Sequence, residues 1–71
     1  MPKYVIIVLE TTHETMALED WLKAHRFWHE VIPKPAKAKT ECGLALKIKR
    51  SGKKEILKLL RNEKIKIKNL F

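Results

Sequence analysis

The stretch YVIIVLETTHE, residues 4–14, decides the fold. Its first six residues are apolar and mostly β-branched, which predicts a strand with two apolar faces at the centre of a sheet. Thr11 is followed three residues later by Glu14, the spacing of a capping box, so a helix should begin at about residue 12. The chain therefore opens with a central strand that turns directly into a helix.

The first helix and the second strand follow. Apolar side chains recur at helical spacing up to His25, where the helix should end. Residues 27–32 are aromatic and β-branched and precede Pro33, which predicts a second strand.

The second half of the chain repeats the alternation of strand and helix. Residues 44–49 alternate between apolar and mostly basic side chains, which predicts a third strand with one solvated side. Ser51 or Gly52 can cap a second helix that ends near Asn62. Residues 64–68 alternate again and predict a fourth strand, with residues 70–71 as a short apolar tail.

The order β-α-β-β-α-β predicts one α+β domain over residues 1–71, with the ferredoxin-like split βαβ fold. Right-handed crossovers give an antiparallel four-stranded sheet in the order 4-1-3-2, with both helices on one face. In this topology the start of the first helix and the loop before the third strand lie at the same edge. Cys42 should therefore lie beside residues 11–13.

Cys42 is the chain's only cysteine, and it ends the proline- and lysine-rich stretch PKPAKAKTECG, residues 33–43. Nearby cations favour a thiolate, and a loop can leave it accessible, as a reactive thiol requires. The alternative is a small buried hydrophobe, the commonest state of a free cysteine. Both interpretations stay open on the residues alone.

The predicted neighbours of Cys42 can act on its thiol. A helix N-terminus lowers the pKa of a thiol, and Lys34, Lys37 and Lys39 should act in the same direction. Thr11 and Thr12 can donate hydrogen bonds to sulfur, and His13 can take the proton. In the competing interpretation the threonines are helix caps, which is favoured for them alone, and His13 is a surface residue.

The sequence lacks the residues that metal binding, cysteine-protease chemistry and RNA binding by a sheet would need. Cys42 and His13 supply two metal ligands where structural zinc needs four, so neither a metal nor a cofactor is expected. A cysteine protease would need a third orienting group and a cleft, so the protein is not expected to be an enzyme. The third strand offers Ala45, Lys47 and Lys49 on its open face, without the aromatic pair on which RNA-binding sheets stack bases.

The charge is strongly asymmetric. Residues 1–32 carry three basic and five acidic side chains, a balance of −2, whereas residues 33–71 carry thirteen and three, a balance of +10. This half could meet nucleic acid, an acidic protein or only solvent. Lysine outnumbers arginine 13 to 3, which favours a solvated surface over specific nucleic-acid recognition.

The apolar segments bear on where the protein is located and whether it self-associates. No segment is long and apolar enough for a membrane span, and no signal peptide is visible, so we expect a cytoplasmic protein. One apolar set of the first strand should remain on the open face of the sheet and favour a homodimer through that face. Lysine stems that shield the patch are the alternative. The two candidate sets are Val5, Ile7 and Leu9, or Tyr4, Ile6 and Val8.

Three short motifs together resemble the small selenium/sulfur carrier-like family: VLETTH at residues 8–13, VIPKP at 31–35 and ECGLAL at 41–46. That family pairs a strand ending in a Ser/Thr-Thr/Ser-His turn with a proline-containing loop and a Cys-Gly dipeptide. The resemblance covers residues 4–49. Residues 36–41 are more basic and poorer in serine than the family pattern, which leaves the partner open.

The resemblance implies that Cys42 carries sulfur or selenium as a persulfide or selenylsulfide. The partners would be the enzymes that donate and accept the chalcogen, with His13, Thr12 and Gly43 around the thiol. The rival hypothesis is a small basic module that binds RNA or an acidic protein, in which Cys42 is incidental.

Overall fold

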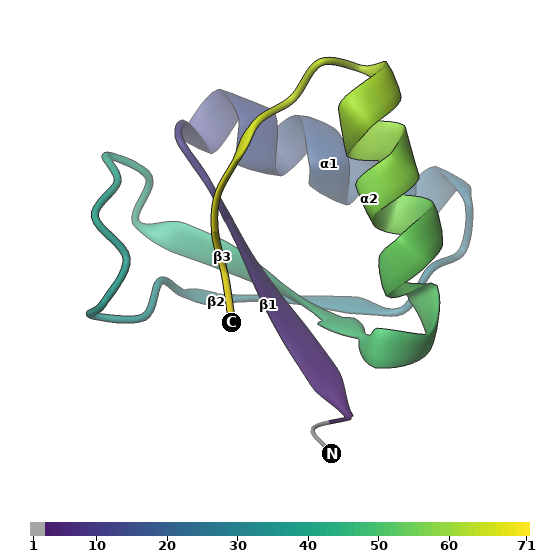
Figure 1. Ribbon diagram of the computed structural model, residues 1–71, viewed down its shortest axis with the longest axis horizontal. Coiled ribbons are helices and arrows are strands. Elements are labelled where there is room, and N and C mark those ends of the chain that lie inside the picture. Colours follow the sequence, from purple (N-terminus) through teal and green to yellow (C-terminus); the bar gives the residue numbers. More distant parts are fainter. Residues whose placement is uncertain (1–2) are drawn as a thin grey trace.

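The computed structural model describes residues 3–71 and has the element order β-α-β-β-α-β (Figure 1). All strand pairs are antiparallel, and the sheet order is β2-β3-β1-β4. The predicted ferredoxin-like α+β fold and its strand order are therefore confirmed. The elements are β1 Tyr4–Leu9, α1 Thr12–Ala24, β2 His29–Pro33, β3 Leu44–Lys49, a 3₁₀ turn η1 Arg50–Gly52, α2 Lys53–Asn62 and β4 Ile67–Leu70.

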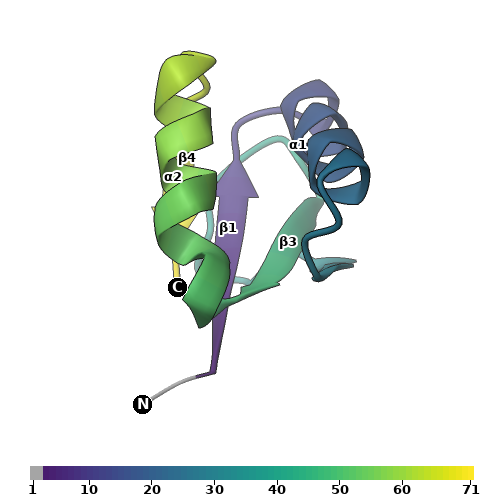
Figure 2. The same cartoon turned by 90° about the vertical axis from the view of Figure 1, so that its right-hand side faces the viewer.

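The main core lies between the sheet and the two helices (Figures 1 and 2). Val5, Ile7 and Leu9 face the helices, because side chains alternate along a strand. Of the two predicted sets, Tyr4, Ile6 and Val8 therefore belong to the opposite face. The other buried members of the main core are Leu18, Leu22, Leu46, Ile48, Ile56 and Leu60.

The end of α1 displaces the second strand from its predicted position. Arg26 has φ 58°, its N–H donates to Lys23 O at 3.2 Å, and the N–H of Phe27 donates to Leu22 O at 2.9 Å. This is a Schellman motif, in which the residue after the left-handed position packs back on the helix. Phe27 packs against the main core, so the strand starts at His29 instead of residue 27.

The end of α2 repeats this motif. Lys64 has φ 58°, its N–H donates to Arg61 O at 3.2 Å, and the N–H of Ile65 donates to Leu60 O at 2.9 Å. The prediction of a strand over residues 64–68 was therefore wrong by about three residues. Leu70, predicted to lie in a tail, is part of β4 and pairs with Ile7.

A second, smaller core covers part of the opposite face. The loop between β2 and β3, residues 34–43, places Ala38 against Val8 and Ala45, and all three are at most 2% exposed. This part of the sheet was predicted to be open, and the structure corrects that. The apolar surface left for a homodimer is correspondingly smaller than predicted.

Candidate functional site

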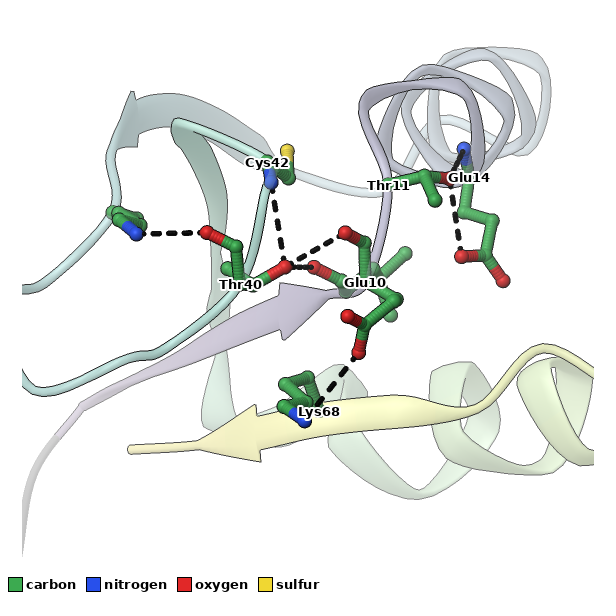
Figure 3. Close-up of polar contacts among 8 residues, drawn as sticks. Glu10, Thr11, Glu14, Thr40, Cys42 and Lys68 are labelled. Atoms are coloured by element: carbon green, nitrogen blue, oxygen red, sulfur yellow. Dashed lines mark hydrogen bonds and ion pairs between the residues drawn. The ribbon is translucent and has the colours of Figure 1, made fainter.

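Cys42 lies where the 34–43 loop meets the first turn of α1. Its Sγ is 3.2 Å from Thr15 Oγ1 and 3.7 Å from Thr12 Oγ1. The predicted convergence of the loop with the start of the first helix is therefore confirmed (Figure 3). Of the two interpretations left open, the structure shows the buried cysteine, since Cys42 is 0% exposed. Its side chain packs between the loop and the helix instead of facing solvent.

Thr11 is the N-cap of α1 and does not serve the thiol. Its Oγ1 accepts from the N–H of Glu14 at 3.1 Å and lies 3.1 Å from Glu14 Oε1, to which it donates (Figure 3). A side-chain acceptor at this position satisfies one of the free amides of a helix start. The capping interpretation is confirmed for Thr11, whereas Thr12 reaches the sulfur.

His13 is exposed at the start of α1, and among the described residues no hydrogen bond joins it to Cys42. The cause is helical geometry. Residues three apart, such as Thr12 and Thr15, share a face, whereas adjacent residues point about 100° apart. The structure therefore does not bring His13 to the thiol as predicted.

Gly43 follows the cysteine without a conformational need for glycine. Its φ is not positive, and a Cβ built on it would meet nothing within 4 Å. The residue is exposed, so the surface next to the buried sulfur is open. The absence of a side chain at Gly43 leaves free space there.

Thr15 is the main partner of Cys42, and the sequence analysis missed it. It is 2% exposed and lies on the buried stripe of α1 with Leu18 and Leu22. A hydroxyl in a stripe otherwise filled by leucine was the available signal. Its Oγ1 also donates to Thr11 O at 3.0 Å, which satisfies the buried hydroxyl.

The hydrogen bonds of the site suit both protonation states of the sulfur. A neutral thiol can donate to Leu44 O at 3.3 Å, and the N–H of Leu44 donates to Sγ at 3.4 Å. A hydroxyl has one proton, so Thr15 must turn from Thr11 O toward Sγ to donate to a thiolate. Thr11 O keeps the N–H of Thr15 at 3.1 Å, so this rotation leaves it partnered.

The pKa of Cys42 lies below its ordinary value. Burial raises it, but hydrogen bonds from Thr15, from the N–H of Leu44 and from Thr12 lower it, and the charge of Lys34 adds to them. The lowering effects together outweigh the burial. Of the three lysines predicted to lower the pKa of the thiol, Lys34 alone contributes to the lowering.

Thr40 fastens the loop to the end of β1. Its Oγ1 donates to Leu9 O at 2.9 Å and to Glu10 O at 2.7 Å, and it accepts from the N–H of Cys42 at 3.3 Å (Figure 3). Lys34 joins residues within the loop, with Nζ donating to Thr40 O at 2.9 Å and its N–H to Gly43 O at 3.0 Å. The hydroxyl of Thr40 is therefore the polar group of this set that ties the loop to β1.

Within residues 3–71, no cluster of three or more His, Cys, Asp or Glu side chains could hold a metal ion. Over the same residues, no helix has the length and apolar character needed to cross a membrane. What the site offers is therefore a single thiol, two hydroxyls and a backbone amide.

One comparison with known proteins finds a match. Residues 3–71 match the model of the family described as "Putative Se/S carrier protein-like". Neither the curated proteins nor the solved structures contain a match to the chain. Because the family model covers nearly the whole sequence, including Cys42 and the first turn of α1, the chain belongs to this Se/S carrier protein-like family.

Proposed function

We propose that the protein carries sulfur or selenium on Cys42 as a persulfide or selenylsulfide and delivers it to a partner enzyme. The observation that carries the proposal is the environment of the sulfur. Thr15, Thr12 and the N–H of Leu44 surround Sγ within hydrogen-bond reach and lower its pKa in spite of burial. Family membership supports the same role.

The transfer is an exchange between thiols. The Cys42 thiolate attacks the outer sulfur of a persulfide on the donor enzyme, a new S–S bond forms, and the old one breaks. The donor cysteine leaves as a thiolate and takes a proton from water. An acceptor thiolate later attacks the outer sulfur on Cys42 in the same way, so no net oxidation occurs. A lowered pKa favours Cys42 as nucleophile at neutral pH and as leaving group.

Burial of Cys42 requires that its cover move during transfer. The 34–43 loop has no regular secondary structure and is held to β1 by the hydroxyl of Thr40 and by the packing of Ala38. In this proposal residues 34–41 lift, while Cys42, held by Leu44 at the start of β3, stays beside Thr12 and Thr15 on α1. The open surface at Gly43 suits the approach of a partner. His13 lies exposed on the same helix turn, and its role as acceptor of the thiol proton stays a prediction.

In this proposal the protein is a carrier and not itself an enzyme, and it needs no cofactor. Its partners are the enzymes that supply and consume the chalcogen, and the reducing cytoplasm is the expected location because the single thiol must stay free. Pairing of two copies through the sheet stays a prediction.

The test is loading of the thiol followed by release. The folded protein is incubated at neutral pH with glutathione persulfide, and intact mass is measured before and after treatment with excess thiol. We expect the gain of one sulfur atom, fully reversed by thiol, and no gain for Cys42→Ser. Thr15→Val should load more slowly, while Thr15→Ser, which keeps the hydroxyl, should load like the parent chain. Loading of the unfolded chain alone would overturn the proposal.

A further inference from the structure

An exposed aromatic pair lies on the open face of the sheet, at the end away from the 34–43 loop. Tyr4, the first residue of β1, is 40% exposed, and Trp28, just before β2, is 39% exposed. Their ring centroids are 5.3 Å apart. Phe71 is 42% exposed, and its backbone pairs with Ile6 on β1. This pair was not predicted from the sequence, because base-stacking aromatic residues were sought only on the third strand.

Two lysines from β3 lie over these rings. Lys47 Nζ is 4.4 Å from the centroid of Tyr4, and Lys49 Nζ is 5.7 Å from that of Trp28. The strand register explains the arrangement, since Tyr4 pairs with Lys49 and Ile6 with Lys47. Cross-strand partners point to the same face, so rings and cations form one surface. We call it the Tyr4–Trp28 platform.

We propose that the Tyr4–Trp28 platform binds single-stranded nucleic acid without sequence preference. Every base has a flat π-face that can stack on an exposed ring, and the adjacent phosphates need cations. Lys47 and Lys49 reach the rings on flexible stems, so they can move from ring to phosphate when a base arrives. The net charge of +8 favours the encounter with a polyanion.

The platform fits other polyanions less well. An acidic protein could pair with Lys47 and Lys49, but its carboxylates would leave the ring faces unstacked. A duplex hides the faces of its bases within the stack. Glu30 lies opposite Lys47 on the same face, and its carboxylate repels phosphate but can accept hydrogen bonds from base amino or ribose hydroxyl groups.

The first experiment is fluorescence anisotropy of a labelled twelve-nucleotide oligouridylate at several salt concentrations. Replacing Tyr4 and Trp28 together by leucine keeps apolar contact but removes the rings, and affinity should fall roughly tenfold or more. Met16→Ala, at an exposed apolar residue on α1, is the matched control and should bind like the parent chain. Unchanged affinity of the leucine variant would overturn the proposal.

The second experiment separates local from diffuse charge. Replacing Lys47 and Lys49 by alanine should flatten the log–log salt slope by about 1.4, at about 0.7 per phosphate contact in a single strand. Replacing Lys54 and Lys58 on α2 removes the same charge elsewhere and should leave the slope unchanged. An equal loss from both pairs would mean that binding follows net charge, and the platform would have no part in it.

The third experiment reports on stacking itself. In a Trp21→Phe background, Trp28 is the one remaining tryptophan, and its fluorescence should be quenched by oligouridylate. Polyglutamate of matched charge should leave it unquenched, and equal quenching would assign the surface to acidic proteins instead. Light scattering gives the remaining outcome: a dimer that the leucine variant dissociates would assign this face to a second copy of the chain and overturn the proposal.

Discussion

The two faces of the sheet are covered in different ways. Nine side chains pack at the helix-covered face, each at most 3% exposed, and they come from β1, β3, α1 and α2. The opposite face has a core of three buried residues, Val8, Ala38 and Ala45, under a loop without regular structure. The helix cover is therefore expected to be permanent, whereas the loop cover can be removed at small cost.

Cys42 lies at the boundary between these two covers. Its backbone belongs to the 34–43 loop, but its hydroxyl partners, Thr12 and Thr15, belong to the helix. Movement of residues 34–41 alone would expose the sulfur and leave Cys42 beside these hydroxyls. The difference between the two faces thus matches what a carrier thiol needs, protection at rest and access during transfer.

The largest expected effect tests the helix-covered face. Leu46→Ala should lower the free energy of unfolding by about 2–5 kcal/mol, because a buried leucine is replaced by a cavity. Ala38→Gly, in the loop, removes one buried methyl group and raises the conformational entropy of the unfolded chain. It should lower the free energy of unfolding by about 1 kcal/mol. Urea denaturation compares the two. Ile48→Val should lower the free energy of unfolding by only about 0.5–1.5 kcal/mol, so it tests the same face in a variant that stays folded.

Equal costs for Leu46→Ala and Ala38→Gly would contradict the comparison, since the loop would then be as firmly packed as the helices.

The next effect tests the loop fastening. Thr40→Val removes the one hydroxyl proton shared between Leu9 O and Glu10 O, and the acceptor of the Cys42 N–H. One hydrogen bond contributes about 0.5–1.5 kcal/mol. Opening of the loop should become roughly ten times more frequent, and alkylation of Cys42 by iodoacetamide should accelerate by the same factor. Thr40→Ser keeps the hydroxyl and is the control. Unchanged labelling of Thr40→Val would show that other contacts keep the thiol covered.

Most of the fold followed from local patterns. The run of residues 4–9 and the capping box of Thr11 and Glu14 act within a few residues, so β1 and the start of α1 were predicted closely. Both helix ends were also predicted to within one residue, but the starts of the strands after them were not. Arg26 and Lys64 adopt the left-handed conformation that glycine usually marks. No glycine signals the residues that fold back on each helix, so both following strands were placed too early.

The position of the site was predicted, and so were Thr12 and Lys34 as neighbours of the thiol, but Thr15 and Thr40 were not. Topology alone placed Cys42 beside the start of α1. Its hydrogen bonds join residues 27 and 30 apart in the chain, and those of Thr40 join residues 30 and 31 apart. Such pairings depend on how the loop packs over the sheet, which no local pattern reports. Thr15 was detectable as a hydroxyl in a stripe of leucines, whereas no pattern in the sequence distinguished Thr40 from other loop residues.

A smaller effect tests the helix side of the sulfur. Thr15→Val should raise the pKa of Cys42, because a thiolate loses a hydrogen bond. The rate of alkylation at neutral pH should fall several-fold, and its pH profile should move to higher pH. Thr15→Ser should keep the parent profile. If Thr15→Val kept the pH profile of the parent chain, the lowered pKa would be due to the N–H of Leu44, Thr12 and Lys34 instead.

The same pKa predicts a pH dependence of stability. A depressed folded-state pKa means that the unfolded chain binds more protons, so the free energy of unfolding rises with pH between the folded and unfolded pKa values of Cys42. The gain is complete above the unfolded value and is lost as pH falls through the folded one. Urea denaturation of the parent chain and of Cys42→Ser at several pH values should show this rise in the parent alone.

The smallest expected effect concerns the helix ends and tests whether the two covers are independent. A non-glycine residue in the left-handed conformation costs about 1–2 kcal/mol, and glycine gives back about 0.5–1 kcal/mol through the unfolded chain. Lys64→Gly should therefore stabilise the protein by a few tenths to about 1 kcal/mol in urea denaturation. Lys58→Gly, inside α2, is the matched substitution and should destabilise by about 1 kcal/mol.

If loop opening alone exposes Cys42, neither variant should change its alkylation rate. Labelling that slows in Lys64→Gly and accelerates in Lys58→Gly, in proportion to stability, would mean that the sulfur is reached only by global unfolding. The loop would then be as permanent a cover as the helices.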